Sequence, residues 1–136
     1  MITVTCAIIL FRGRVLAAQR SADMSLPLKW EFPGGKLEPG EAPEICVVRE
    51  IEEELRLAVR VLERAPTVMH QISETKEMEL IPYVCIAETD VVELQEHAQV
   101  KWCDTEELGK LDWARADIEV LRWWETIGRE KGWEGQ

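Results

Sequence analysis

The chain has 136 residues, with 26 acidic side chains against 16 basic ones and a net charge of −10 at pH 7. Because 46% of the residues are hydrophobic, the composition excludes intrinsic disorder and predicts one globular domain over residues 1–136. The negative charge disfavours nucleic acid polymers and anionic membranes as partners, since phosphate contacts need Lys and Arg.

The sequence also favours a cytoplasmic location. No apolar run is long enough to cross a bilayer, and the N-terminus lacks the basic segment and cleavage site of a signal peptide. The four cysteines and two histidines have no spacing typical of a zinc site. Buried free thiols in a reducing compartment are therefore expected.

The N-terminal part of the chain predicts a strand pair followed by a long loop. Residues 3–10 are typical of a buried strand, and residues 14–19 of its partner across a turn at Arg12 and Gly13. Residues 21–34 are expected to form a long loop with a short extended piece at 30–32. Long loops inside compact domains are often functional.

A helix is predicted to begin at Pro43, because proline suits the first helical position. Ile45, Val48, Ile51 and Leu55 recur at spacings of three and four. This spacing predicts one apolar stripe along the helix.

The remaining chain predicts further strands and two more helices. Residues 57–72 and 77–87 are β-like on either side of a polar turn, and residues 98–102 form another candidate strand. A short helix at 105–108 and a final helix over 117–129 follow. This order predicts a mixed α/β sandwich.

Three glutamates on the predicted helix point to a bound cation. Glu50, Glu53 and Glu54 share one face, because each residue of an α-helix turns by about 100°. Their charges repel one another, and Mg²⁺ prefers such carboxylate oxygens. A solvated acidic surface is the alternative. The preceding Gly34 and Gly35 favour the cation, since glycine lets the backbone approach an ion or phosphate closely.

This segment resembles the signature of the Nudix hydrolase family. The signature is Gly, five residues, Glu, seven residues, Arg-Glu, an aliphatic, any residue, Glu-Glu, any residue, Gly and an aliphatic. The positions that match are Gly35, Glu41, Arg49, Glu50, Ile51, Glu53, Glu54 and Leu57.

One position departs from the signature, because Arg56 replaces its second glycine. That glycine ends the helix in a left-handed conformation, which another residue adopts at a cost of about 1–2 kcal/mol. We expect an effect on the helix exit and not on the carboxylates.

The resemblance implies an α/β/α sandwich, with a mixed sheet between helices, that hydrolyses nucleoside diphosphates linked to another group. It implies Mg²⁺ as the cofactor, with Mn²⁺ as a possible substitute. The implied metal ligands are Glu50, Glu53, Glu54 and the backbone carbonyl of Gly34.

The same resemblance implies roles for other residues of the signature segment. Arg49 is expected to orient the helix carboxylates through charge-assisted hydrogen bonds and, with Glu50, Glu53 and Glu96, to form the catalytic set. Glu41 is expected to hold the loop against the helix, next to a structural Gly35, and Lys36 is expected to contact phosphate.

The sequence WEFPGGK at residues 30–36 is similar to the MutT-like branch of the family, which includes oxidised-guanine and cytidine triphosphate pyrophosphohydrolases. This likeness implies a small-molecule nucleoside triphosphate as the partner, cleaved to monophosphate and pyrophosphate by a monomer or homodimer. It places 8-oxo-dGTP ahead of CTP or 5-methyl-dCTP. A catalytically silent Nudix-fold binding module is the alternative, although such modules usually lack the metal carboxylates.

Four residues outside the signature receive roles from this likeness. Arg20 is expected to bind phosphate and Phe32 to contact the base, with core packing an equal alternative for Phe32. Glu96 matches a loop carboxylate that acts as general base, with a solvated loop acid as the alternative. Asp117 matches the residue that reads the base edge, where a carboxylate accepts from an amino group. Capping of the last helix is compatible with that role.

Overall fold

The computed structural model describes residues 1–133. Its strands are β1 (Ile2–Phe11), β2 (Arg14–Gln19), β3 (Trp30–Glu31), β4 (Gly34–Lys36), β5 (Val59–Arg64), β6 (Val68–Gln71), β7 (Glu77–Ala87) and β8 (Gln99–Cys103). Its helices are α1 (Pro43–Leu55), α2 (Thr105–Gly109), α3 (Arg115–Thr126) and the 3₁₀ helix η1 (Gly128–Lys131).

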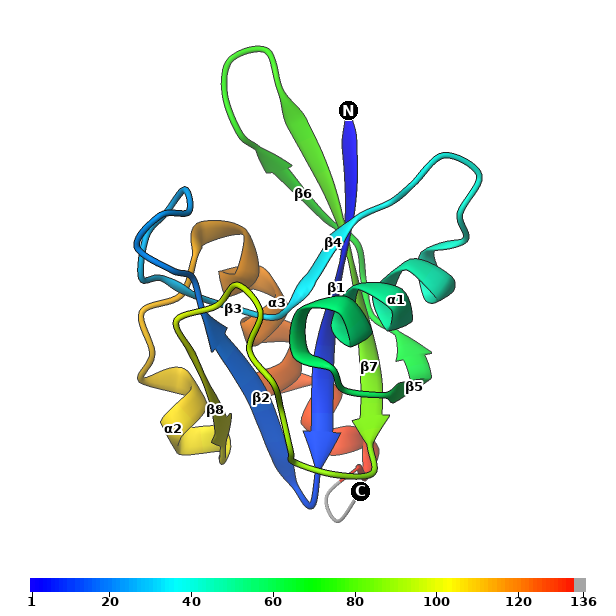
Figure 1. The fold of residues 1–136 in the computed structure, drawn as a ribbon, viewed down its shortest axis with the longest axis vertical. Coiled ribbons are helices and arrows are strands. Elements are labelled where there is room, and N and C mark those ends of the chain that lie inside the picture. Colours follow the sequence, from blue (N-terminus) through cyan, green and yellow to red (C-terminus); the bar gives the residue numbers. More distant parts are fainter. Residues whose placement is uncertain (134–136) are drawn as a thin grey trace.

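The strands form one mixed sheet with β1 near its centre (Figure 1). The order is β3-β2-β1-β7-β5, with β4 paired to β1, β6 to β7 and β8 to β2. β1 runs parallel to β7, whereas β2 and β4 pair with β1 in the antiparallel direction. Arg12 (φ 48°) and Gly13 (φ 77°) form the predicted turn between β1 and β2, because both adopt the positive φ that a two-residue hairpin requires.

Two hydrophobic cores lie on opposite faces of the sheet, because successive side chains of a strand point to opposite sides. Helix α1 covers one face and α3 the other (Figure 1). The first core includes Ala7, Ile9, Val47, Ile51 and Leu55. The second includes Cys6, Ile8, Leu10, Val120, Leu121 and Trp124. The predicted α/β class and the placing of the sheet between helices are therefore confirmed.

Helix α1 begins at Pro43 as predicted, but its buried stripe differs by one residue. Ile51 and Leu55 are buried, whereas Ile45 is 62% exposed. Ile45 precedes Ile51 by six residues, which places it about 120° away from the buried face. Cys46 and Val47 fill the core in its place.

Two other predicted boundaries are wrong. Residues 34–36 form a strand instead of ending a loop, because their backbone pairs with β1. The last helix begins at Arg115 and ends at Thr126, short of residue 129. At Gly128 the chain packs so closely on the rings of Trp123 and Trp124 that a Cβ atom would lie 2.7 Å from each.

The four cysteines are free and buried, as the sequence predicts. Within residues 1–133, no helix is long and apolar enough to cross a membrane.

Candidate active site

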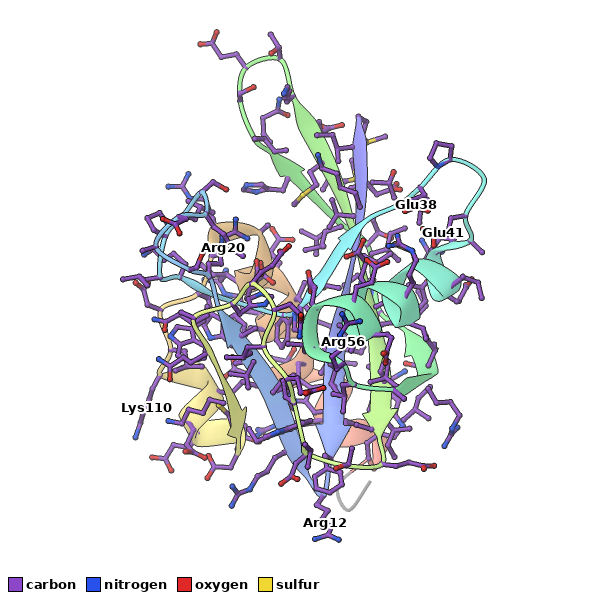
Figure 2. The ribbon with its side chains drawn as sticks, viewed as in Figure 1. Arg12, Arg20, Glu38, Glu41, Arg56 and Lys110 are labelled. Carbon is purple, nitrogen blue, oxygen red and sulfur yellow. The ribbon has the colours of Figure 1, made fainter. Side chains whose placement is uncertain are left out.

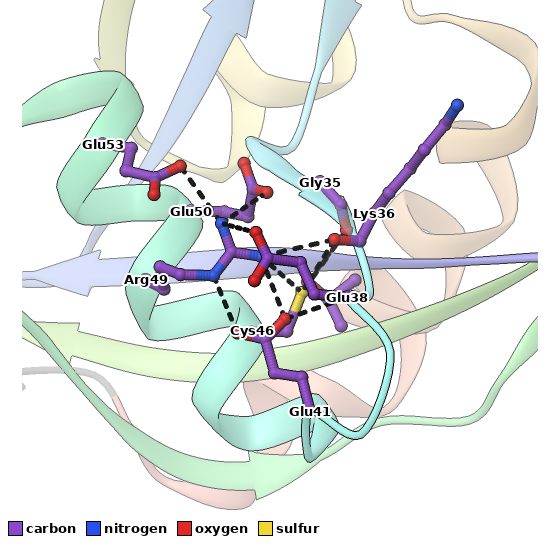
Figure 3. Close-up of polar contacts among 9 residues, drawn as sticks. Gly35, Lys36, Glu38, Glu41, Cys46, Arg49, Glu50 and Glu53 are labelled. Atoms are coloured by element: carbon purple, nitrogen blue, oxygen red, sulfur yellow. Dashed lines mark hydrogen bonds and ion pairs between the residues drawn. The ribbon is translucent and has the colours of Figure 1, made fainter.

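Arg49 lies at the centre of an ion-pair network on α1 (Figure 3). Its guanidinium donates to both carboxylate oxygens of Glu41, at 2.7 and 2.9 Å. It also donates to Glu50 at 3.0 Å and Glu53 at 3.1 Å. These bonds lower the pKa of Glu41 to about 2 and raise that of Arg49. Glu41 belongs to the loop before α1 (Figure 2), so Arg49 ties this loop to the helix.

Gly34 and Gly35 let this loop approach the core and the helix. A Cβ on Gly34 would lie 2.0 Å from the carbonyl oxygen of Thr5, and one on Gly35 would lie 2.3 Å from the carboxylate carbon of Glu50. Both distances are shorter than any van der Waals contact. Glycine at these positions is therefore a steric requirement of the close packing between β4, β1 and α1.

A cavity of about 530 Å³ opens beside this network. The loop after β2 and the β6–β7 hairpin contribute apolar side chains to its wall, among them Met24, Leu26, Ile72 and Met78. The charged residues and histidines that line it are Arg20, Glu31, Lys36, Glu54, His70, Glu96, His97 and Asp117. Side chains that are far apart in the sequence, from Arg20 to Asp117, thus line one cavity.

Glu54 is the acid of α1 that faces the cavity. Its Oε2 atom is buried and has no hydrogen-bond partner within the described part of the chain. Burial raises its pKa to about 9, and the neighbouring charges of Glu31, Glu50 and Glu96 act in the same direction. Burial also raises the pKa of Glu50, although Arg49 opposes it. Acidic groups therefore gather where the protein supplies little to offset their charge, and the Glu54 carboxyl stays protonated at neutral pH.

Two backbone hydrogen bonds bring Glu96 to the same place. The amides of Glu93 and Gln95 donate to the carbonyls of Leu55 (2.9 Å) and Glu54 (3.2 Å). These carbonyls end α1 and have no partner within the helix. The loop before β8 is thereby held against α1, and Glu96 lines the cavity with Glu54.

Phe32 and Asp117 lie at another part of the cavity wall. Phe32 is buried and its ring lies 4.6 Å from that of Trp113. Asp117 accepts a 2.9 Å hydrogen bond from the Phe32 amide, and burial raises its pKa to about 8. The helix-capping role of Asp117 is wrong, because α3 begins earlier and Ala114 occupies the N-cap position.

Arg20 and Lys36 occupy different settings in the cavity wall. The Arg20 guanidinium donates to Glu31 at 2.6 Å and to Ser25 at 2.6 and 3.0 Å, so its donors face protein atoms. Lys36 is exposed and extends away from the ion-pair network (Figure 3).

Sequence reasoning missed three residues of this site. Glu31 accepts hydrogen bonds from Arg20 and from His97, at 2.6 and 2.8 Å. Cys46 donates its thiol toward the carbonyls of the glycine loop. Glu31 lies inside the WEFPGGK segment, and its charge between two aromatic residues is the available signal. The partners of His97 and Cys46 are distant in sequence, which left no local signal.

The carboxylate oxygens of this site fit a divalent cation, although the carboxylates do not surround one point. Among residues 1–133, no group of three or more His, Cys, Asp or Glu side chains is arranged to hold a metal ion. Glu53 contacts Arg49, whereas Glu54 faces the cavity. The unpartnered oxygen of Glu54, among further carboxylates, is the kind of group that a cation satisfies.

The comparison with known families agrees with the glycine loop, the Arg49 network and the acidic helix face. Residues 1–124 match the NUDIX domain. The chain is a Nudix hydrolase. Nudix hydrolases generally use divalent metal ions, which agrees with the carboxylates of α1.

Relatives of this Nudix hydrolase carry two kinds of name. The CTP pyrophosphohydrolase of Escherichia coli is 35% identical over 121 residues, which cover 89% of each chain. The 8-oxo-dGTP diphosphatase of Escherichia coli is 51% identical over 43 residues, which cover 32% of this chain and 33% of that protein.

A solved structure of MutT from methicillin-resistant Staphylococcus aureus 252 shares the fold. It is 39% identical, with a TM-score of 0.73, and the alignment covers 92% of this chain and 95% of that one. The hydrolase is thus similar to MutT proteins in fold and in sequence.

Proposed function

We propose that this Nudix hydrolase is a Mg²⁺-dependent nucleoside triphosphate pyrophosphohydrolase with 8-oxo-dGTP as its preferred substrate. The observation that carries the proposal is the buried, unpartnered Oε2 of Glu54, which lies among other carboxylates in the wall of the cavity. An acidic chain needs a cation at this point before it accepts a polyphosphate.

The metal ligands would be Glu50, Glu53, Glu54 and the backbone carbonyl of Gly34. A bound Mg²⁺ neutralises phosphate oxygens and acidifies or positions a water molecule. Arg49 holds Glu50 and Glu53 through its guanidinium. It therefore orients two of the proposed ligands.

The protein's own residues supply the proton transfer and the contacts to the substrate. Glu96 is the proposed general base, which takes a proton from the attacking water. As the new oxygen–phosphorus bond forms, the bond between the α- and β-phosphates breaks, and monophosphate and pyrophosphate leave. Exposed Lys36 is suited to contact the triphosphate, and Arg20, which uses three of its five N–H donors on Glu31 and Ser25, is the second proposed phosphate contact.

Asp117 and Phe32 are the proposed base-reading residues. A pKa of about 8 keeps the Asp117 carboxyl protonated at neutral pH, so that it offers one acceptor and one donor. An oxidised guanine presents the acceptor O6 beside a protonated N7, which complements this pair. Unmodified guanine presents two acceptors on that edge. This difference favours the oxidised base over the ordinary one.

CTP or 5-methyl-dCTP is the second candidate. Cytosine also presents an acceptor, N3, beside a donor, its amino group. The relative that carries the name CTP pyrophosphohydrolase aligns over most of this chain. The donor and acceptor of Asp117 suit this base equally well.

The metal assignment is tested by pyrophosphate release at increasing Mg²⁺ concentration. Glu53→Gln should lower turnover by about 100-fold or more, because it removes a charged ligand. Glu52→Gln is the matched control, since Glu52 is exposed on the same helix and outside the ion-pair network. Equal turnover of the two variants, or full activity in EDTA, would remove the assignment.

A further inference from the structure

Glu31 joins two residues that are far apart in the sequence. Its Oε1 atom accepts from Arg20 at 2.6 Å, and its Oε2 atom pairs with Nε2 of His97 at 2.8 Å. The His97 side chain is only 1% exposed and that of Glu31 is 17% exposed. A carboxylate oxygen accepts, so Nε2 is the donor and the imidazole is fixed in one orientation.

His97 is the one buried residue of the segment 88–98 that connects β7 to β8. The chain before it is held at Gln95, whose amide donates to the end of α1. The chain after it is held at Ala98, whose amide donates to the carbonyl of Gln19 at 2.9 Å. Glu96 therefore lies between a backbone anchor on α1 and a side-chain anchor on Glu31.

The contacts that support His97 extend to the loop after β2. Arg20 holds Glu31 and at the same time donates to the backbone and side chain of Ser25. Figure 2 shows Arg20 in the loop that follows β2. The chain Arg20–Glu31–His97 thus connects this loop to the segment that carries Glu96.

We propose that His97 is a positioning residue that holds the Glu96 carboxylate in its reactive place, with Glu31 and Arg20 as its support. This inference rests on the proposed function, in which Glu96 is the general base. A displacement of about 1 Å at such a group can cost about 100-fold in rate. His97 acts through Glu96, so its loss changes kcat and leaves the affinity for the substrate.

The first test compares His97→Phe with His97→Gln. Phenylalanine keeps a planar ring but removes the donor to Glu31, whereas the glutamine amide nitrogen reaches the same place as Nε2. We expect His97→Phe to lower kcat by about 10- to 100-fold at unchanged KM, and His97→Gln to stay near wild type. Wild-type kcat in His97→Phe, or equal losses in both variants, would overturn the inference.

The second test repeats His97→Phe in a Glu96→Gln background. If His97 acts only through Glu96, the double variant should have the activity of Glu96→Gln alone. The same fold-loss in both backgrounds would show an independent role and overturn the proposal. If His97→Phe does not fold, Glu31→Gln takes its place, because it removes the charge that pairs with His97. Its kcat is measured in the wild-type and Glu96→Gln backgrounds, and the two possible outcomes are interpreted in the same way.

The third test needs no activity. Amide hydrogen exchange at Gln95 and Ala98 reports whether the segment is held, because both amides are hydrogen-bonded. We expect at least about 10-fold faster exchange at both in His97→Phe than in wild type and His97→Gln; unchanged exchange would overturn the inference. Absence of wild-type turnover on any nucleotide would instead reject the proposed function, and this exchange result would then decide on the positioning alone.

Discussion

Burial and neighbouring charges together decide how individual acids of the site behave. Glu41 and Asp117 are both carboxyl groups, yet the pKa of Glu41 is lowered to about 2 and that of Asp117 is raised to about 8. Glu41 faces the guanidinium of Arg49, whereas Asp117 is buried and accepts only from the Phe32 amide among the described hydrogen bonds. One is a permanent ion-pair partner, and the other is a neutral donor and acceptor at pH 7.

The protonation of Asp117 gives the recognition of the base a pH dependence. As the pH rises from 7 to 9, through the pKa of about 8, the carboxyl loses its donor. The kcat/KM for 8-oxo-dGTP should then fall by about 10-fold more in wild type than in Asp117→Asn, because the hydrogen bond to O6 is lost.

Two variants separate this effect from the titration of the base itself. Asp117→Asn keeps a donor and an acceptor, and should hold the preference over the whole range. Asp117→Ala should lack the preference at every pH. The same fall in wild type and Asp117→Asn, or Asn and Ala variants that behave alike, would contradict the assignment.

At the scale of the element, the exit of α1 departs from the family signature. Arg56 has φ 52° and ψ 38°, the left-handed conformation expected where the signature has glycine. Its amide donates to the carbonyl of Glu52 at 2.9 Å, so the helix ends without losing this bond. The expected effect on the helix exit is therefore strain at one residue, in a turn that is still made.

Replacement of Arg56 by glycine should stabilise the protein. Arg56→Gly relieves the left-handed strain, and should raise the free energy of unfolding by about 1 kcal/mol with unchanged kcat. Urea denaturation measures the change. Arg60→Gly, on the extended strand β5, is the control and should destabilise by about 0.5–1 kcal/mol. A loss of stability in Arg56→Gly would disprove the strain.

Element boundaries were predictable only where local pattern and tertiary packing agree. The strands 14–19 and 77–87 match β2 and β7, because alternation, turn residues and burial all point the same way. The strand at Gly34–Lys36 was not predictable, since glycine has low strand propensity and only the approach of β1 selects it. The predicted burial of Ile45 is wrong for a related reason, because spacing alone does not decide which side of a helix faces the core.

At the scale of the whole molecule, the site unites segments from both halves of the chain. The signature spacing pointed to Gly35, Glu41, Arg49 and Glu50, because one loop and one helix carry them all. The pairing of Glu31 with His97 spans 66 positions, and no local pattern encodes it. Local spacing therefore predicts the loop and the helix that carry these residues, whereas the residues of the cavity wall are predicted only through resemblance.

The arrangement of the sheet and α1 explains how segments from both halves of the chain meet at the site. β1 pairs with β4 on one side and β7 on the other, and α1 packs on the face between them (Figure 1). The glycine loop, the end of α1 and the segment before β8 then converge on the same cavity. The fold thus brings these three short segments to one place.

The most direct measurement is the rate and the products of hydrolysis of 8-oxo-dGTP, dGTP, CTP and 5-methyl-dCTP with Mg²⁺ at pH 7. We predict monophosphate and pyrophosphate as the products, with kcat/KM for 8-oxo-dGTP at least about 10-fold above that for dGTP. A similar excess for a cytidine nucleotide would select the second candidate substrate. Release of inorganic phosphate, or no turnover above Glu53→Gln on any of the four, would contradict the proposed pyrophosphohydrolase.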